Sequence, residues 1–435
     1  MPAGRPVCYN QSMDDWKAYV EELGMSARRA SQQLVGLSDA TKSSALRQIA
    51  VAIRSGTAKL IEANQKDIQA ATSGGLAPAL IERLKLNEKR IESMANGVEQ
   101  IAAQVDPVGQ VLEGYVRPNG LRIEKRRVPI GVVCFFYESR PNVTSDAAAL
   151  CLKSGNAIIL RGGKEAIHSN QAIAAIIADA LRKAEIDPAA VQLIEHTDRS
   201  LVSPLLKLDR YIDLVIPRGG ENLIRTVVKE STIPVLKHFT GNCHIFIDSD
   251  IDGMADEVVK VCVNAKTSYP GGAVCNAVEH LIFHKDAAAS LLPKVCQVLA
   301  DAKVEIRGDE RCRALFPAAK QVTAEDWDTE YLALVVGIKV VDSLRQAIDH
   351  INEHGSHHTD AILTGNLRHA EQFARNIDSA SVMVNCSTRF ADGGEYGLGA
   401  EIGISTDKLH ARGPMGLDEL TSYKFVIRGT GQVRT

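Results

Sequence analysis

Apolar residues recur every three or four positions through the first hundred residues, which is the spacing of amphipathic helices. The stretch ALRQIAVAIRSGTAKLIEANQKDI (45–68) is typical of this region. Ala, Leu, Lys, Glu and Gln dominate residues 13–105, and Ser38 and Asp39 are suitable N-cap residues for one helix. We therefore expect a helical N-terminal region.

The pattern changes in VLEGYVRPNGLRIEKRRVPIGVVCFFY (111–137). Apolar and polar positions alternate on both sides of Pro118, Asn119 and Gly120, which together form a strong turn signal. We expect a β-hairpin here. The largely apolar GVVCFFY that follows predicts a buried strand.

Strand-like and helix-like segments alternate through the rest of the chain. The twenty residues KEAIHSNQAIAAIIADALRK, for example, separate two strand-like runs. The strand-like runs are AIILRG (157–162), VQLIE (191–195), LVIPRGG (214–220), HIFID (244–248), HLIFH (280–284), LVVGIKVV (334–341), DAILTG (360–365) and SVMVN (381–385). This alternation predicts α/β units with parallel-sheet cores, two of them between residues 128 and 411.

Length and composition agree with a multidomain globular protein. The 435 residues are too many for one ordinary core, and 45% are apolar and 24% charged. The formal charge of -3 argues against a nucleic-acid or membrane-surface binder. No apolar run approaches the roughly 18 residues of a membrane span, and the first residues lack an apolar signal core. A cytoplasmic location is therefore expected.

The nine cysteines predict neither a disulfide framework nor a structural zinc site, because their number is odd and CxxC spacing is absent. Most of them should be small buried apolar residues. Cys275 differs, because TSYPGGAVCNAVEHLIF places it after two glycines, before Asn276 and at the entry to a strand. A core residue, a metal ligand, half of a disulfide and a nucleophile all remain possible from this context, which permits an exposed thiol of lowered pKa.

Two strand ends carry features suited to phosphate. Arg161 and Lys164 follow one strand in ILRGGKEA, and Arg218, Gly219 and Gly220 separate another strand from a helix that opens near residue 221. Cations, and backbone N–H groups at a helix start, can bind an anion. Solvated loop charges and glycines needed for turn geometry explain the same residues without a ligand. GxGxxG is absent; GLGAEIG (397–403) fits a loop better, so a standard Rossmann site is not expected.

Three further loops contain candidate residues. Arg140 and Asn142 lie in YESRPNVTSD, and Arg389 lies in the long glycine-rich segment 385–406. An arginine can pair with a carboxylate or phosphate, and an amide can donate to an oxyanion. The histidines of HGSHHTD, which are His354, His357 and His358, are explained more simply by a helix end capped at Gly355 than by a metal, so no metal is predicted.

Several long blocks resemble the gamma-glutamyl phosphate reductases, a family of proline synthesis within the aldehyde dehydrogenase superfamily. The blocks are VPIGVVCFFYESRPNVTSDAAALCLKSGNAIILRGGKEA, YIDLVIPRGG, the segment with Cys275 and Asn276, and VNCSTRFADGGEYGLGAEIGISTDKLHARGPMGLDELTSYKFVIRG. The resemblance runs from about residue 20 to the end, with a longer spacing between Pro270 and Cys275 than in the family pattern. No glutamate kinase domain is expected before it.

The resemblance implies an aldehyde dehydrogenase-like fold of two α/β domains and a small β oligomerisation arm. A nucleotide-binding domain would comprise residues 1–113 and 128–235, and a catalytic domain residues 236–411. The arm would comprise residues 114–127 and 412–435, including the YKFVIRG strand. A homo-oligomer, at least a dimer, is implied, as is a possible association with glutamate kinase.

The resemblance also implies the reaction and its residues. NADPH would reduce L-glutamyl 5-phosphate to glutamate 5-semialdehyde, with Cys275 as nucleophile and Asn142 as oxyanion donor. Arg161 and Lys164 would hold the adenosine ribose and its 2′-phosphate, the loop of Arg218, Gly219 and Gly220 would bind a phosphate, and Glu330 would hold the nicotinamide ribose. The substrate's anionic groups would meet Arg140 and Arg389, with hydrogen bonds from Ser387 and Thr388.

Hydrolytic aldehyde dehydrogenases use a glutamate to activate water, and the matching stretch here, KHFTGNCHI (237–245), has no carboxylate. Water should then attack a thioester slowly. A hydrolytic dehydrogenase, a coenzyme A-acylating dehydrogenase, a thiol hydrolase pairing Cys275 with His280 or His238, and a silent nucleotide-binding scaffold are the alternatives.

Overall fold

The computed structural model describes residues 13–434, which divide into two compact units. The first unit comprises residues 13–237, 398–403 and 415–434, and the second comprises His238–Gly397 and Ile404–Pro414. The predicted start of a new domain at residue 236 lies two residues from this division. Among the described residues, no helix is long and apolar enough to cross a membrane.

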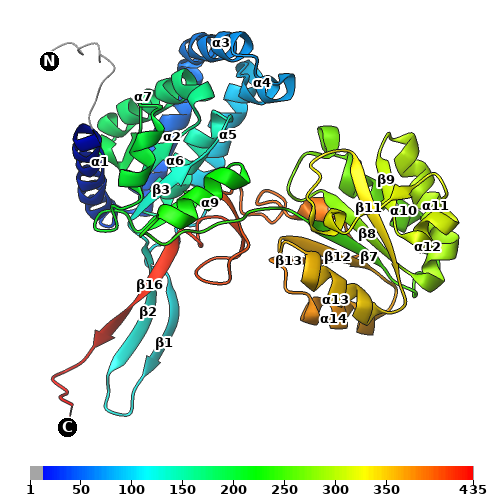
Figure 1. Ribbon diagram of the computed structural model, residues 1–435. Helices are drawn as coiled ribbons and strands as arrows, with labels where there is room; N and C mark the ends of the chain where they lie inside the picture. The colour runs from blue at the N-terminus through cyan, green and yellow to red at the C-terminus, as the bar shows by residue number, and fades with distance from the viewer. Residues whose placement is uncertain (1–12, 435) are drawn as a thin grey trace. The chain divides into compact units, whose positions relative to one another are not determined.

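Five helices open the first unit, as the helical periodicity predicted (Figure 1). Ser38 caps the second of them by accepting a hydrogen bond from the Thr41 N–H. The helices bury their apolar stripes, including Leu46, Ile49 and Ile53, at 0–2% exposure. They are α1 (Met13–Leu34), α2 (Asp39–Ser55), α3 (Thr57–Ser73), α4 (Pro78–Leu84) and α5 (Glu88–Ala103).

A four-stranded parallel sheet forms the α/β core of the first unit, in the order β5-β4-β3-β6. Its strands β3, β4 and β6 are fully or largely buried. A strand covered on both faces needs apolar residues at successive positions, and these three strands are such runs. The strands are β3 (Val132–Phe136), β4 (Ala157–Arg161), β5 (Val191–Leu193) and β6 (Leu214–Pro217). The accompanying helices are α6 (Asn142–Lys153), η1 (Lys164–Ala166), α7 (Ile167–Lys183), η2 (Pro188–Ala190), η3 (Arg199–Leu201), α8 (Val202–Leu205) and α9 (Glu221–Glu230).

Three antiparallel strands extend from the first unit as an arm, in the order β1-β2-β16 (Figure 1). The predicted hairpin is present: β1 (Val111–Val116) and β2 (Arg122–Pro129) flank a turn in which Gly120 has a φ of 87°. The C-terminal strand β16 (Thr421–Arg428) pairs with β2 over its whole length. The arm leaves apolar side chains on its surface, including Tyr423, Phe425 and Ile427.

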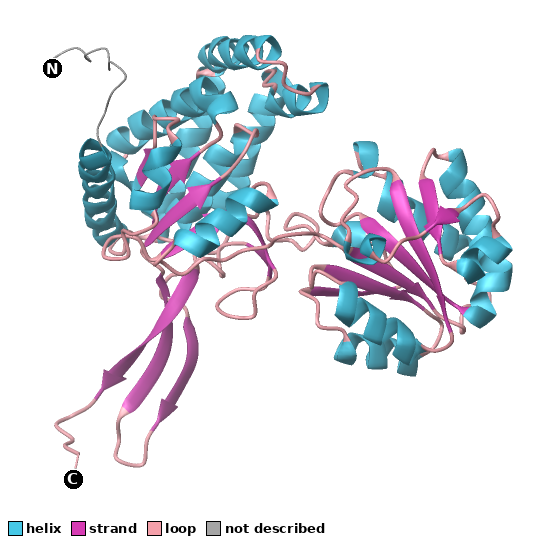
Figure 2. Cartoon of the chain, in the orientation of Figure 1, coloured by secondary structure: helices cyan, strands magenta, loops and turns pink. Residues whose placement is uncertain are grey.

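The second unit contains a seven-stranded parallel sheet with helices beside it (Figure 2), in the order β10-β9-β11-β8-β7-β12-β13. Its strands are β7 (Cys243–Ile247), β8 (Val278–His284), β9 (Glu305–Gly308), β10 (Lys320–Gln321), β11 (Val335–Val341), β12 (Thr359–Leu363) and β13 (Ser381–Val384). Its helices are α10 (Ala255–Thr267), η4 (Pro270–Gly272), α11 (Lys285–Asp301), α12 (Glu310–Leu315), η5 (Glu325–Asp328), α13 (Leu344–His354), α14 (Leu367–Asn376) and η6 (Thr388–Phe390). Short strands β14 (Gly403–Ser405) and β15 (Gly413–Met415) pair where the chain passes between the units.

Candidate functional site

Predicted cofactor, catalytic and substrate residues of the first unit lie at one edge of its sheet. β3, β4 and β6 are neighbouring parallel strands, so their carboxyl ends meet at the same edge. Arg161 ends β4, Arg218 follows β6, and Arg140 and Asn142 follow β3. Open α/β sheets bind ligands at this edge. Strand order therefore brings these four residues to one edge, although they are widely separated in sequence.

Arg161 and Lys164 differ in their surroundings. Arg161 is half-buried, its guanidinium carbon lies 5.9 Å from the Phe136 ring centre, and its buried Nε has no hydrogen-bond partner. Desolvation lowers the pKa of this guanidinium, and the positive charge of Arg199 adds to the lowering. Lys164 is exposed at the start of η1. A desolvated cation with an unused donor suits a bound anion.

The loop of Arg218, Gly219 and Gly220 separates β6 from α9, as predicted. The Gly220 N–H, at the N-cap of α9, donates to Glu138 Oε1 at 3.0 Å. A Cβ added at Gly219 would lie 2.7 Å from the same carboxylate oxygen and would displace this exposed side chain. The Glu138 carboxylate thus already uses the anion-binding property of this helix start.

Asn142 is the first residue of α6, and its amide is held by a carboxylate one turn further on. Asn142 Nδ2 donates to Asp146 Oδ2 at 2.9 Å. Desolvation raises the pKa of Asp146 to about 6, against the hydrogen bond from Asn142 and the positive charge of Arg218, which lower it. An amide nitrogen carries two N–H groups. One N–H therefore fixes the Asn142 side chain, and the other can still serve a ligand.

In the second unit, four of the candidate residues lie at the amino ends of neighbouring strands. Cys275 precedes β8, His238 precedes β7, His358 precedes β12, and Glu330 precedes β11. The order β11-β8-β7-β12 makes these strands neighbours. One ligand atom from each of His238, Cys275 and His358 lies within 4.8 Å of the other two. The stretch KHFTGNCHI (237–245), which matches the glutamate segment of hydrolytic aldehyde dehydrogenases, therefore brings His238 close to the Cys275 thiol.

Glycines set the path of the chain around Cys275. Gly271 and Gly272 have φ values of 71° and 67° in the turn before it, where residues with a Cβ are strained. A Cβ on Gly241 would lie 2.0 Å from the Cys275 carbonyl oxygen. The Cys243 thiol also donates to that oxygen at 3.2 Å. The β7 entry segment therefore packs directly on the Cys275 backbone.

Cys275 is more accessible than most of the described cysteines. Of the eight described cysteines, only Cys275 and Cys386 are partly exposed. Burial raises the pKa of several others, including Cys262, whose pKa is about 12. These fit the predicted role as small core residues. Cys8 lies outside the described residues.

The loop after β13 binds the Cys275 segment. Thr388 Oγ1 donates to the Asn276 carbonyl at 2.7 Å, and Asn276 Nδ2 donates to the Arg389 and Ala391 carbonyls at 3.3 and 3.0 Å. Arg389 Nε donates to Ser268 Oγ at 3.1 Å, and its buried Nη1 has no hydrogen-bond partner. Ser387 and Thr388 are buried. Thr388 and Asn276 therefore fix the position of the loop that carries Arg389.

A buried ion pair next to Glu330 was missed at the level of sequence. Lys266 Nζ and Glu279 Oε2 lie 2.8 Å apart, and both side chains are fully buried. Desolvation raises the pKa of Glu279 to about 7 despite the Lys266 charge, and the negative charge of Glu330 adds to the rise. Glu279 is the one carboxylate in the fully buried strand VEHLIFH, which is the signal that could have revealed it.

The three histidines of HGSHHTD separate in the structure. His354 ends α13, with Gly355 as its cap, and pairs with Asp328 at 2.8 Å. His357 donates from Nδ1 to the Asp378 carbonyl. Only His358 reaches Cys275. His280, considered as a partner for the thiol, is instead buried in β8 and stacked on His244.

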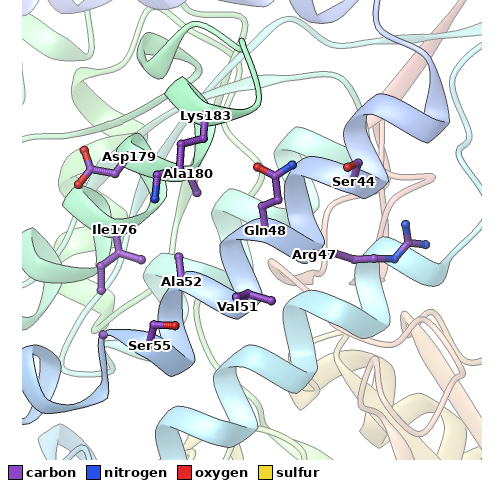
Figure 3. Close-up of a pocket in the computed structure, with 11 residues that line it drawn as sticks. Ser44, Arg47, Gln48, Val51, Ala52, Ser55, Ile176, Asp179, Ala180 and Lys183 are labelled. Atoms are coloured by element: carbon purple, nitrogen blue, oxygen red, sulfur yellow. The ribbon is translucent and has the colours of Figure 1, made fainter.

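Figure 3 shows a surface hollow of the first unit between α2 and α7. Val51, Ala52 and Ile176 form its apolar part, with Arg47 and Lys183 beside them. It contains none of the predicted catalytic, cofactor or substrate residues, so we assign it no role in the chemistry.

Comparison with known proteins places this geometry in a family. A model of the aldehyde dehydrogenase family matches residues 7–315. The gamma-glutamyl phosphate reductase of Geobacter metallireducens is 50% identical over 416 residues, which are 95% of this chain and 98% of that protein. The crystal structure of gamma-glutamyl phosphate reductase from Thermotoga maritima is 45% identical, with a TM-score of 0.93 over 96% of this chain and 100% of that chain. The Saccharomyces cerevisiae structure of that name is 33% identical, with a TM-score of 0.53 over 96% and 98%.

The predicted aldehyde dehydrogenase-like fold is confirmed by the Thermotoga maritima structure. The identity to the Geobacter metallireducens protein extends over nearly the whole of both chains. The chain therefore belongs to the aldehyde dehydrogenase family and, within it, to the gamma-glutamyl phosphate reductases.

Proposed function

We propose that the protein is an oxidoreductase of proline biosynthesis that reduces L-glutamyl 5-phosphate to glutamate 5-semialdehyde, releasing phosphate. The observation that carries this proposal is the partly exposed Cys275 beside a segment, residues 238–242, that contains no carboxylate. A thiolate can accept the acyl group, and without the carboxylate that activates water in hydrolytic aldehyde dehydrogenases the thioester survives until it is reduced. Family membership supports this function over a hydrolytic or coenzyme A-acylating one.

In the proposed mechanism the Cys275 thiolate attacks the acyl-phosphate carbon. The C–S bond forms, the C–O bond to phosphate breaks, and phosphate leaves with the electron pair. The second Asn142 N–H donates to the carbonyl oxygen as it becomes negative. NADPH, when bound, supplies the hydride that reduces the thioester, and the thiolate then leaves from the reduced carbon.

The decisive experiment is the reverse reaction, in which glutamate semialdehyde, in equilibrium with pyrroline-5-carboxylate, is oxidised with NADP⁺. We expect NADPH formation to require inorganic phosphate, because phosphate must release the acyl group from Cys275. The absorbance of NADPH is followed with and without phosphate at constant ionic strength. Equal rates without phosphate would mean that water resolves the thioester, and the hydrolytic alternative would replace this proposal.

We propose NADPH as the cofactor, held by Arg161 and Lys164. The buried Arg161 Nε without a partner, and the exposed Lys164 ammonium at the same strand end, fit a 2′-phosphate. Replacing Lys164→Ala should raise the KM for NADPH about tenfold, the effect of losing about 1.5 kcal/mol from one charged hydrogen bond. The KM for NADH should not change. Lys183→Ala, an exposed lysine at the end of α7, is the matched control, and equal effects on both cofactors would contradict the assignment.

The oxyanion role of Asn142 has its own test. Asn142→Ala should lower kcat roughly 10²–10³-fold, as expected for loss of one oxyanion donor. The KM for NADP⁺ should stay near its original value. Steady-state kinetics of the reverse reaction measure both quantities. A loss confined to KM would instead place Asn142 in ground-state binding.

For the remaining cofactor contacts, we propose that Arg218, Gly219 and Gly220 bind a phosphate after Glu138 moves from the Gly220 N–H, and that Glu330 holds the nicotinamide ribose. Arg140 and Arg389 would meet the substrate's phosphate and α-carboxylate. Ser387 would add a hydrogen bond, whereas the Thr388 hydroxyl already donates to Asn276. Unchanged substrate KM in both Arg140→Ala and Arg389→Ala would contradict the substrate assignments.

Two partnerships are also proposed. The apolar strip on β16, with Phe425 55% and Ile427 59% exposed, is suited to burial against a second copy of the chain. A single-chain mass in sedimentation at micromolar concentration would contradict this homo-oligomer. Association with glutamate kinase would deliver the labile acyl phosphate directly. A cytoplasmic location is part of the same proposal.

A further inference from the structure

The second unit contains two groups of side chains that could hold a metal ion, and they differ in how their polar atoms are used. One group consists of Asp248, Asp250 and His369. Its atoms are bonded to one another and to neighbours: His369 Nδ1 lies 2.7 Å from Asp248 Oδ2, and the Thr364 hydroxyl donates to the same oxygen at 2.6 Å. These hydrogen bonds account for the placement of the three side chains without a metal ion.

The other group consists of His238, Cys275 and His358, whose ligand atoms lie within 4.8 Å of one another. In a tetrahedral zinc site, ligand atoms about 2.0–2.3 Å from the metal lie about 3.5 Å apart. Closing the group around an ion therefore needs movements of about 1 Å. His238 and Cys275 both lie on loops and are partly exposed, so they can make such movements and an ion can reach them.

Two features of the histidines suit a metal. His238 Nδ1 is buried and has no hydrogen-bond partner. His358 Nδ1 lies 2.8 Å from Thr359 Oγ1 and 3.8 Å from Cys243 Sγ; in the tautomer whose Nδ1 donates to the Thr359 hydroxyl, Nε2 is the ligand atom. Metal-binding histidines are generally oriented by an outer acceptor of this kind. Thr359 is fully buried at the start of β12, so the acceptor is held by the sheet.

We propose that His238, Cys275 and His358 bind one Zn²⁺ ion, and that the ion inhibits the enzyme by occupying its nucleophile. Two imidazoles and a thiolate are ligands that zinc prefers, and water completes the tetrahedron. On binding, the Cys275 S–H bond breaks, its proton goes to solvent, and the sulfur electron pair forms the Zn–S bond. That pair is then not available for attack on an acyl carbon. The inhibition rests on the proposed function, whereas the binding does not.

The test is Zn²⁺ binding to the full chain, measured by equilibrium dialysis against a chromogenic chelator with Zn²⁺ alone. The wild-type chain should bind one ion at this site. Loss of an outer-shell partner costs about 10–100-fold in metal affinity, so His238→Gln and Cys275→Ser should each lower affinity at least tenfold. Co²⁺ in place of Zn²⁺ should give a thiolate charge-transfer band that Cys275→Ser abolishes.

His357→Asn is the matched control, because it removes the neighbouring imidazole, and asparagine tolerates the φ of 61° at this position. It should bind Zn²⁺ like the wild type. In the reverse reaction, Zn²⁺ should inhibit wild type and His357→Asn alike, a chelator should restore activity, and His238→Gln should need at least tenfold more Zn²⁺. Unchanged affinity in both His238→Gln and Cys275→Ser would overturn the proposal. Because dialysis does not use the reductase reaction, failure of the metal site and failure of the proposed function give different results.

Discussion

Cys275→Ser should abolish reductase turnover, lowering kcat by a factor on the order of 10⁴ or more, as loss of a covalent nucleophile does in other enzymes. A serine hydroxyl has a much higher pKa than a thiol and is a weak nucleophile without a strong base. The reverse reaction with phosphate and NADP⁺ measures the loss. NADP⁺ binding, followed by quenching of intrinsic fluorescence, should stay intact, because Cys275 is not one of the proposed cofactor residues and all of these except Glu330 lie in the other unit.

Cys386→Ser is the control for thiol loss, since Cys386 is the other partly exposed cysteine among the described residues. It should keep near-wild-type turnover. Alkylation of the wild type should remove activity in proportion to modification of Cys275. Substantial turnover by Cys275→Ser would assign the covalent step to another residue.

Lys266→Met should destabilise the second unit by about 3–5 kcal/mol, because it leaves the Glu279 carboxylate buried without its counter-ion. Methionine fills a similar volume, so packing loss contributes little. The chain has only two tryptophans. In a Trp16→Phe background, the fluorescence of Trp327 reports unfolding of the second unit in urea.

This deficit should grow with pH. The folded pKa of Glu279, about 7 with Lys266 present, lies above its ordinary value of 4.5, and loss of the lysine raises it further. A raised pKa means that the folded state favours the protonated carboxyl. The contribution of the protonated Glu279 carboxyl to the free energy of unfolding is fully present below about pH 4.5 and is lost as pH rises through 7. Unfolding at about pH 6 and about pH 8 should show the larger deficit at the higher pH.

Lys260→Met, an exposed lysine on the same helix α10, should change stability by less than about 0.5 kcal/mol. Lys266→Met combined with Glu279→Leu should recover most of the loss, because no buried charge then remains. An equal deficit in the single and double variants would show that the lysine acts through packing.

The sequence predicted the elements of the fold because each has a local signal. Helical periodicity revealed the N-terminal helices, Pro118, Asn119 and Gly120 revealed the hairpin, and the change from LVIP to a polar helix placed the start of α9 at Glu221. The candidate residues at strand ends followed from the same signals. Assignment of the catalytic roles depended on resemblance, because a loop cysteine has many explanations.

The grouping at the amino ends of the second sheet could not be predicted in this way. It depends on the spatial order of β8, β7 and β12, and strand order is set by long-range packing that leaves no local pattern. His358 was therefore assigned with its sequence neighbours His354 and His357. Lys266 and Glu279 are thirteen residues apart, and their pairing depends on how α10 packs against β8.

The pairing of β16 with β2 has a consequence for synthesis on the ribosome. β2 ends at Pro129 and its partner begins at Thr421, and the whole second unit is translated between them. The second unit is nearly continuous in sequence and can fold as it emerges from the ribosome. The first unit cannot be completed until β16 has been translated, and until then one edge of β2 is unpaired. An exposed strand edge is prone to pairing with other chains. We therefore expect nascent chains stalled before residue 421 to recruit chaperones through this arm, and release past residue 428 to end that dependence.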